Sequence, residues 1–215
     1  MNSANTLRQA TNRDRFPGRR LVGLPPGLRP VFAAMLLVVL FGSGIPRVAE
    51  AKVFASQKQA LAEAFPEASR IERRTLLLRA EQVAKIERLI GRRVEAKVVV
   101  IHVAYQDEKV LGYAEVAVHT VRTQPEAMLI VLSPDGRIRS VRIIAFHEPL
   151  DYLPTESWYA QFAGKGKGDG LRIGREVHGV VGATLSAQAA ADGVRRMLAY
   201  WEVLLQPASG PTQRP

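Results

Sequence analysis

Four apolar runs separated by short turns dominate the middle of the chain, and they limit it to a small set of folds. The runs are Val94–Tyr105, Val110–Thr120, Met128–Leu132 and Arg137–Phe146. Turn-forming residues lie between them at Gln106–Lys109 and Ser133–Gly136. Consecutive strands joined by tight turns pair antiparallel, so we expect a mainly antiparallel, twisted sheet. Such a sheet needs another element to cover its apolar face.

A long amphipathic helix after the sheet can provide this cover. Its apolar positions recur every three or four residues at Ala187, Ala191, Val194, Leu198, Trp201 and Leu205. Upstream, Phe54–Phe65 and Ala80–Ile90 have helical patterns, and Ile71–Leu78 is extended and apolar. The predicted class is therefore α+β, with an N-terminal helical segment before the sheet and a long C-terminal helix after it.

The first 51 residues have the pattern of an export signal. A basic leader precedes the apolar run Val31–Phe41, and Ala49-Glu50-Ala51 matches the small-x-small pattern of a cleavage site. We expect residues 1–51 to be removed and the mature chain to begin near Lys52 in the periplasm. The alternative is an inner-membrane anchor through residues 31–45, although the apolar run is short for a span that needs about 20 residues.

Removal of this segment lowers the charge of the mature protein. The full chain has 30 Lys and Arg against 20 Asp and Glu, a net charge of +10. Residues 1–51 hold seven of the basic and two of the acidic residues, which leaves 23 basic and 18 acidic groups and a net charge of +5. The remaining basic residues are scattered beside acidic ones, which argues against nucleic-acid binding.

The chain contains no cysteine. It therefore cannot form disulfides or hold an iron–sulfur cluster through thiolates, and any redox chemistry needs a bound organic cofactor. The four histidines show none of the spacings of a metal site. We expect one domain at 94–206, with a helical and extended segment at 52–93 packed on it and a disordered tail at 207–215.

A candidate site, His178–Ser186, lies at the start of the long helix. Thr184 is the predicted N-cap, where its hydroxyl can satisfy the first backbone N–H groups of the helix or hold an anion against the helix dipole. Gly179 and Gly182 leave the approach free of bulky side chains. From the residues alone, both the cap and the anion site remain open.

The motif Gly182-Ala183-Thr184-x-Ser186 at the start of a C-terminal helix carries a family resemblance. It resembles the FMN-binding domain of flavin-carrying periplasmic subunits in Na+-translocating NADH:quinone reductase and Rnf-type complexes, and of small secreted relatives. In that family a flavin transferase joins FMN to the threonine through a phosphoester. The resemblance spans Val94–Leu205 and implies that Thr184 carries FMN and that its neighbours bind it. The family usually has an acidic residue and a Ser or Thr where this chain has His178 and Val181.

Two further segments carry the resemblance. His147-Glu148-Pro149 is similar to a family loop near the flavin, which implies that His147 donates to the flavin and that Glu148 tunes the charge of its ring. The alternative is a strand-ending loop that faces water. Trp158 and Phe162 share a helical face, and Trp158 is the candidate for lining the flavin pocket, whereas core packing is the common role of aromatic residues at this spacing.

The expected function is that of an electron carrier rather than a stand-alone enzyme. The protein would hold one FMN and relay electrons between redox partner proteins at or near the cytoplasmic membrane. One alternative is a periplasmic flavin-dependent reductase with His147 as proton donor. Another is a flavin-free accessory protein of a redox complex. Residues 164–170, rich in Gly and Lys, match no phosphate-binding loop and predict a mobile surface loop.

Overall fold

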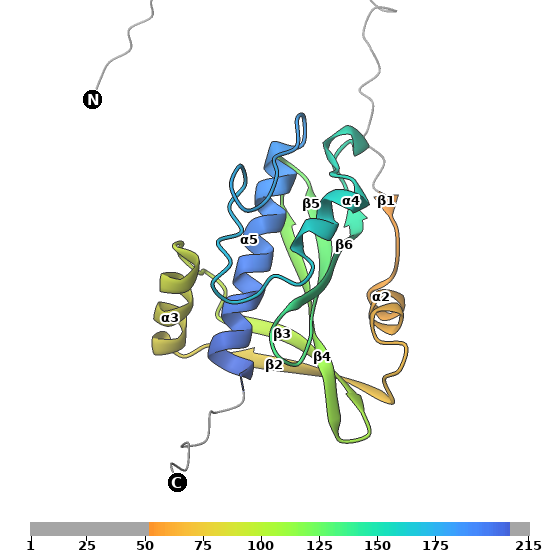
Figure 1. Cartoon of the computed structure of the whole chain (residues 1–215), viewed down its shortest axis with the longest axis vertical. Helices are drawn as coiled ribbons and strands as arrows, with labels where there is room; N and C mark the ends of the chain where they lie inside the picture. Colours follow the sequence, from red (N-terminus) through yellow and green to blue (C-terminus); the bar gives the residue numbers. More distant parts are fainter. Residues whose placement is uncertain (1–51, 207–215) are drawn as a thin grey trace, which may run out of the picture. The chain divides into compact units, whose positions relative to one another are not determined.

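The computed structural model describes residues 52–206 (Figure 1). Six strands form its sheet: β1 (Lys52–Val53), β2 (Arg70–Leu77), β3 (Val98–Gln106), β4 (Lys109–Thr120), β5 (Pro125–Leu132) and β6 (Ile138–Phe146). Every neighbouring pair is antiparallel, and the order across the sheet is β1-β6-β5-β4-β3-β2. With its helices this sheet confirms the α+β class. The predicted export signal or anchor at 1–51 and the tail at 207–215 lie outside the described residues.

Helices lie before and after the main run of strands. They are α2 (Gln57–Ala64), α3 (Ala80–Ile90), α4 (Glu156–Tyr159) and α5 (Thr184–Tyr200), with a π-helical turn over Trp201–Leu205 that extends α5 and 3-10 turns at Leu150–Tyr152 and Ala160–Phe162. Ser56 is the N-cap of α2, and its hydroxyl accepts from the Gln59 N–H. α3 ends at Gly91, where a φ of 70° makes the left-handed turn that glycine adopts at low cost.

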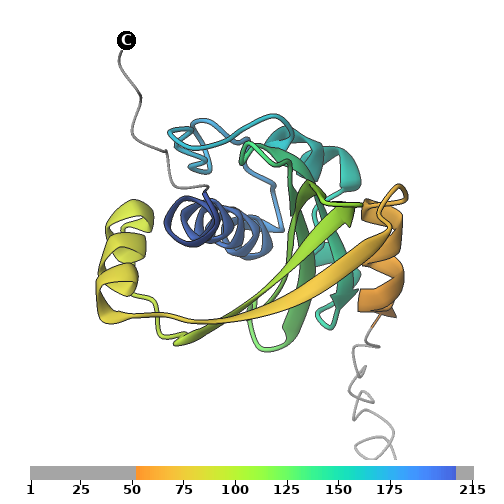
Figure 2. The ribbon, with the colours of Figure 1, turned by 90° about the horizontal axis from the view of Figure 1, so that it is seen from below.

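The sheet curves around α5, which lies on its concave side (Figure 2). Five of the six apolar positions predicted for this helix are buried: Ala187, Ala191, Val194, Leu198 and Trp201 are at most 8% exposed. Leu205, in the π-helical turn, is half-buried. Small residues let the helix lie close to the strands, since a Cβ on Gly193 would stand 2.8 Å from Met128 Cε. α3 packs against α5 as well, so α5 is covered by the sheet and by a second helix.

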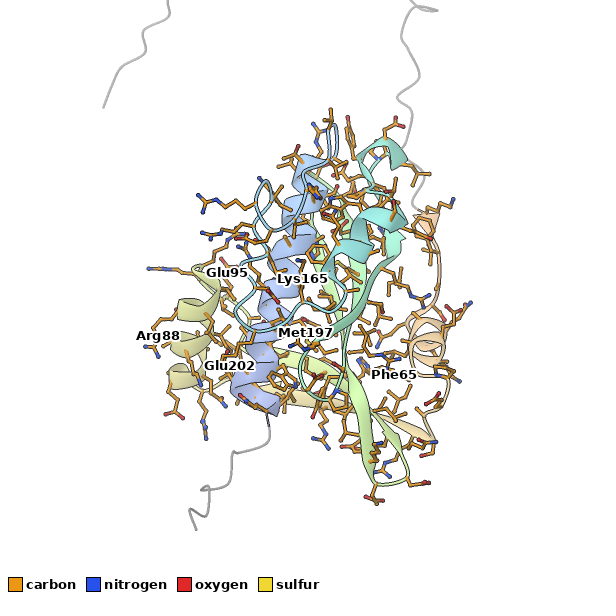
Figure 3. All side chains as sticks on the ribbon, in the orientation of Figure 1. Phe65, Arg88, Glu95, Lys165, Met197 and Glu202 are labelled. Carbon is orange, nitrogen blue, oxygen red and sulfur yellow. The ribbon has the colours of Figure 1, made fainter. Side chains whose placement is uncertain are left out.

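A second, smaller core lies on the opposite face of the sheet. There α2 and Phe65 cover Ala104 and Leu129 from the strands (Figure 3). Met197 of α5, by contrast, lies in the larger core on the concave side. Alternate residues of β3, β4 and β5 therefore enter different cores, which explains why these strands have near-continuous apolar runs instead of alternating polar and apolar residues.

Segment 52–93 belongs to the same sheet as the rest. β2 pairs with β3 over the whole of its length, and β1 pairs with the end of β6. This segment therefore supplies both outer strands of the sheet, and its two helices cover different sides of the molecule (Figure 2).

Two strands, β3 and β5, begin several residues away from their predicted starts. β3 begins at Val98 because the chain first leaves α3 through an irregular connection, in which the Val94 N–H donates to the Glu87 carboxylate (2.9 Å). β5 begins at Pro125, earlier than predicted, since it stays paired with β4 as far as Thr120. Pairing sets where both strands begin, because Val98 pairs with Leu77 of β2 and Pro125 pairs with Thr120 of β4.

The Gly- and Lys-rich loop at 164–170 is tied to the fold. The Gly166 N–H donates to the Asp169 carboxylate (2.7 Å). Lys167 Nζ lies 3.0 Å from Glu202 Oε1 in the π-helical turn. The ammonium group of Lys167 is therefore paired within the chain.

Candidate functional site

Thr184 is the first residue of α5. The N-cap is Ala183, whose backbone is not helical (φ −119°, ψ 30°) while its C=O already accepts from the Ala187 N–H (3.0 Å). The Thr184 hydroxyl donates to the Val180 C=O (3.3 Å) and caps no N–H group. The predicted N-cap role of Thr184 is therefore wrong, because the chain turns into the helix one residue earlier than the pattern suggested.

The surface around Thr184 is open. Thr184 itself is exposed, Val181 is fully exposed, and Leu185 is 49% exposed. Gly182 has a φ of 82°, and a Cβ there would meet no atom within 4 Å. The hydroxyl of Thr184 therefore stands at an accessible helix N-terminus with apolar side chains on either side of it.

Ser186 anchors this end of α5. The resemblance assigned it to flavin binding, but its side chain is buried and its hydroxyl donates to the Tyr152 C=O (2.6 Å). The Arg122 guanidinium lies 4.5 Å from the centre of the Tyr152 ring. Ser186 thus joins the first turn of α5 to the 3-10 turn after β6 and fixes where Thr184 stands.

Glu148 holds the turn between β4 and β5. Its Oε1 accepts from the backbone N–H groups of Thr123 (2.6 Å), Gln124 (2.9 Å) and Arg122 (3.2 Å). These hydrogen bonds hold the pKa of Glu148 below its usual range, although burial of the carboxylate acts to raise the pKa. The hydrogen bond from Thr123 has the largest effect. The side chain is buried, so Glu148 has a structural role. That it also tunes the charge of a flavin ring stays a prediction.

We expect Glu148→Ala to lower the free energy of unfolding by about 2 kcal/mol, because three N–H groups of the turn lose their acceptor. The contribution of the carboxylate is present above the unfolded-state pKa of 4.5 and is lost as the pH falls through the lower folded-state pKa. Urea unfolding at pH 7 measures it, with the exposed Glu67→Ala as control. Equal stability of both variants would contradict this role.

His147 is half-buried beside the same turn. Its Nδ1–H donates to the Pro125 C=O (3.0 Å), which leaves Nε2 as the ring nitrogen that could meet a ligand. The predicted donation from His147 to a flavin would use this atom.

Trp158 lies in the core and does not line the surface around Thr184. It is 7% exposed and packs edge-on against Tyr159 and Phe162, with ring centres 5.0 and 5.4 Å away. Its Nε1–H donates to the His178 C=O (2.7 Å), and the His178 N–H donates to Gln161 Oε1 (2.9 Å). The predicted pocket-lining role of Trp158 is thus replaced by a supporting one, because its indole holds the segment that leads to Thr184. The side chain of His178 is exposed.

A groove of about 670 Å³, which we call the β3–β4 groove, is lined by Leu185, the residue after Thr184. Leu185, Gln188 and Ala189 from the first turns of α5 line it, together with residues 98–100 of β3 and 115–121 from β4 onward. Glu95, in the connection after α3, lines it as well (Figure 3). The groove therefore lies between α5 and the two strands.

Glu115 is buried in this groove. It is 8% exposed, and its Oε2 has no hydrogen-bond partner in the described part of the chain. Burial raises the pKa of Glu115 to about 7, against the opposing effect of the positive charge of Arg196 on α5. A buried carboxyl group without a full set of partners is a common mark of a functional site.

Three further polar side chains meet behind the groove. His119 Nε2 lies 2.5 Å from Glu126 Oε1, and the hydroxyl of Tyr159 is buried without a partner in the described residues. Burial, and to a smaller degree the charge of Glu126, raises the pKa of Tyr159. His119 also lines the β3–β4 groove, so this buried cluster is in contact with it.

The sequence analysis missed Glu115, His119 and Glu126. A signal was present, because Glu115 and His119 alternate with Ala117 on β4 and so share the inward face of a strand. Charged residues at inward positions are rare without a reason. The signal was hidden because β4 is apolar on both faces.

Within residues 52–206, no three His, Asp or Glu side chains gather in a way that could hold a metal ion, and no helix combines the length and apolarity of a membrane span. Comparison of the chain with protein-family models gives no match, and a search of curated proteins finds no significant similarity.

Proposed function

We propose that this protein is an exported flavoprotein that carries one FMN, joined to Thr184 through a phosphoester, and relays electrons between redox partner proteins at or near the cytoplasmic membrane. A flavin transferase would attach the FMN. The observation that carries the proposal is the exposed hydroxyl of Thr184 at the N-terminus of α5.

The N-terminus of α5 suits a phosphate ester. No side chain caps the N–H groups of its first turn. These groups and the helix dipole would stabilise an exposed phosphate by about 0.3–1 kcal/mol. Gly182 leaves room for the phosphate, since a Cβ there would meet no neighbouring atom. The single hydrogen bond of the Thr184 hydroxyl, to the Val180 C=O, leaves its oxygen open to a transferase.

Apolar side chains beside Thr184 suit contact with an aromatic ring. Val181 and Leu185 flank Thr184, and Val118, 64% exposed, lines the β3–β4 groove together with Leu185. Apolar residues that gather at a surface typically mark a ligand or partner site. A ring held there would remain close to the surface, where a redox partner protein could approach it.

FMN, when bound, supplies the one- and two-electron chemistry that a chain without cysteine cannot supply itself. The residues of the chain would bind and orient it. Ser186 and Trp158 fix the position of the Thr184 turn through their hydrogen bonds. In the loop after β6, His147 would meet the flavin through Nε2, since its Nδ1–H already donates to the Pro125 C=O.

The test is the intact mass of the protein made with and without a flavin transferase. We expect an increase of about 440 Da with the transferase, the increment for FMN joined by a phosphoester with loss of water. The increase should survive denaturation and desalting. An unchanged mass, with a control flavoprotein modified in the same cells, would contradict the proposal.

A further inference from the structure

The β3–β4 groove lies where two strands of the sheet separate. β3 pairs with β4 only from His102 to Gln106, opposite residues 109–114. Within the described residues, the earlier part of β3 pairs only with β2, and the later part of β4 pairs only with β5. Residues 185, 188, 189, 192, 195 and 196 of α5, spaced as one face of a helix, also line the groove. The groove is thus an opening between two strands with one face of α5 along it.

Valine side chains flank this opening on both strands. The register of the pair His102 and Ala114, when continued, places Val98 opposite Val118. Both valines line the groove, and they are 50% and 64% exposed. Apolar side chains that gather at a surface typically mark a ligand or partner site. The separated strands therefore offer an apolar contact that a hydrocarbon chain can use.

Charged side chains also line the groove, and the positive ones are in excess. They are Arg92, Arg93, Arg195 and Arg196 against Glu95, Glu115 and Asp192. Asp192 is paired with both Arg92 and Arg195, so two guanidinium groups share one carboxylate. Glu95 is exposed, and water and salt screen its charge. Four positive against three negative groups give a net charge of +1, which rises to +2 when Glu115 holds a proton.

Arg196 and Glu115 are the two groups of the groove best suited to hold an anion. Arg196 is half-buried and forms no ion pair among residues 52–206. Glu115 is buried, and its Oε2 has no hydrogen-bond partner in the same residues. Burial raises the pKa of Glu115 to about 7, although the nearby positive charge of Arg196 acts to lower it. Below neutral pH, Glu115 can therefore donate its O–H beside an unpaired guanidinium group.

We propose that the β3–β4 groove binds a linear alkyl carboxylate of the fatty-acid class, with its carboxylate held by Arg196 and Glu115 and its hydrocarbon chain between Val98 and Val118. A carboxylate has two oxygens and can accept from both groups at once. The volume of about 670 Å³ lies within the usual range for small-molecule sites. The positive excess disfavours an alkylammonium ion of the same length. This inference goes beyond the proposed function and needs no FMN on Thr184.

The probe is decanoate, and isothermal titration calorimetry would measure its binding to the full chain, produced without a flavin transferase, at pH 6. We expect saturable binding of one decanoate per chain. Acetate, which has the carboxylate without the chain, should bind at least about a hundredfold more weakly. Decyltrimethylammonium, which has the chain with the opposite charge, should not compete with decanoate for the site.

A first pair of variants tests the guanidinium group. Arg196→Gln should weaken decanoate binding about tenfold, because the carboxylate loses its charged partner. Arg88→Gln is the matched control, since Arg88 is exposed on α3 and does not line the groove (Figure 3). It changes the net charge by the same amount and should bind decanoate as the unmodified chain does. Thermal unfolding checks that both variants are folded.

A second pair of variants tests the hydrogen bond from Glu115. Glu115→Leu removes the donor and should weaken decanoate binding about tenfold. This variant should fold, because leucine fills the space of a buried carboxyl group that lacks a partner. Glu115→Gln has an N–H donor at the same place and should bind decanoate more tightly than Glu115→Leu does.

Three results would each overturn the inference. They are the failure of decanoate to bind, equal binding by Arg196→Gln and Arg88→Gln, and displacement of decanoate by decyltrimethylammonium. Acetate that binds as tightly as decanoate would equally reject a site for an alkyl chain. The intact mass tests FMN on Thr184 separately, since decanoate binding is measured on protein that has met no transferase.

Discussion

The Thr184→Ala protein is expected to contain no covalent FMN and yet to remain folded. A phosphoester needs the oxygen of the threonine, so the increment of about 440 Da should vanish completely even with a transferase present. The loss of stability should stay below about 1 kcal/mol, because the hydroxyl makes one hydrogen bond, to the Val180 C=O, and alanine favours a helix. Intact mass and thermal unfolding measure the two effects.

Two control variants isolate the hydroxyl of Thr184. Thr184→Ser keeps an oxygen at the same place and should retain covalent FMN, at least in part. Thr155→Ala removes an exposed hydroxyl at the start of α4 and should be modified as fully as the wild type. If Thr184→Ala remains as yellow as the wild type after denaturation and desalting, the flavin is attached elsewhere and the proposed function loses its central residue.

Glu115 is expected to have the largest effect on how stability depends on pH. Its folded-state pKa is about 7, against an ordinary value of 4.5. Below pH 4.5 the carboxyl group is protonated in both states. Between these pH values the unfolded chain releases the proton while the folded chain keeps it, so the free energy of unfolding falls by about 3 kcal/mol as the pH rises. Above about pH 7 the loss is complete.

Glu115→Gln should remove this dependence. The free energy of unfolding of the variant, minus that of the wild type, should grow from near zero at pH 4.5 to about 3 kcal/mol at pH 8. Arg196 and Tyr200 on α5 interact with the carboxyl group and are unchanged in both proteins. Glu108→Gln is the control, since its side chain is 93% exposed, and its difference from the wild type should stay constant. If the free energy of unfolding of Glu115→Gln differed from that of the wild type by the same amount at every pH, the carboxyl group of Glu115 would have an ordinary pKa, and the prediction would be wrong.

Local patterns were enough to predict most of the elements. α3 occupies the predicted residues Ala80–Ile90, because both of its ends carry local signals: a helical pattern that begins at Ala80 and a glycine at 91. The turn at Ser133–Gly136 separates β5 from β6 as predicted. Such features depend on residues that are neighbours in the chain, so a sequence can be read for them directly.

The contacts within the site could not be predicted in this way. The motif located Thr184 at the mouth of α5, but it did not show that Ser186 is bonded to Tyr152 or that Glu148 holds the turn before β5. Their partners are 34 and 25 residues away in the sequence. Trp158 illustrates the same limit, because only packing decides whether an aromatic side chain lines a pocket or lies in the core.

The sequence by itself determined the α+β class, the inward face of α5 and the position of Thr184 at its start, because spacing and turn residues specify local structure. Only the tertiary structure decided that β3 pairs with β4 from His102 onward and not before it, and that Glu115 is buried without a full set of partners. The physical reason is that strand separation results from competition between pairings. Where β3 and β4 separate, β3 stays paired with β2, and β4 stays paired with β5. That competition involves four strands at once, and no local pattern records its outcome.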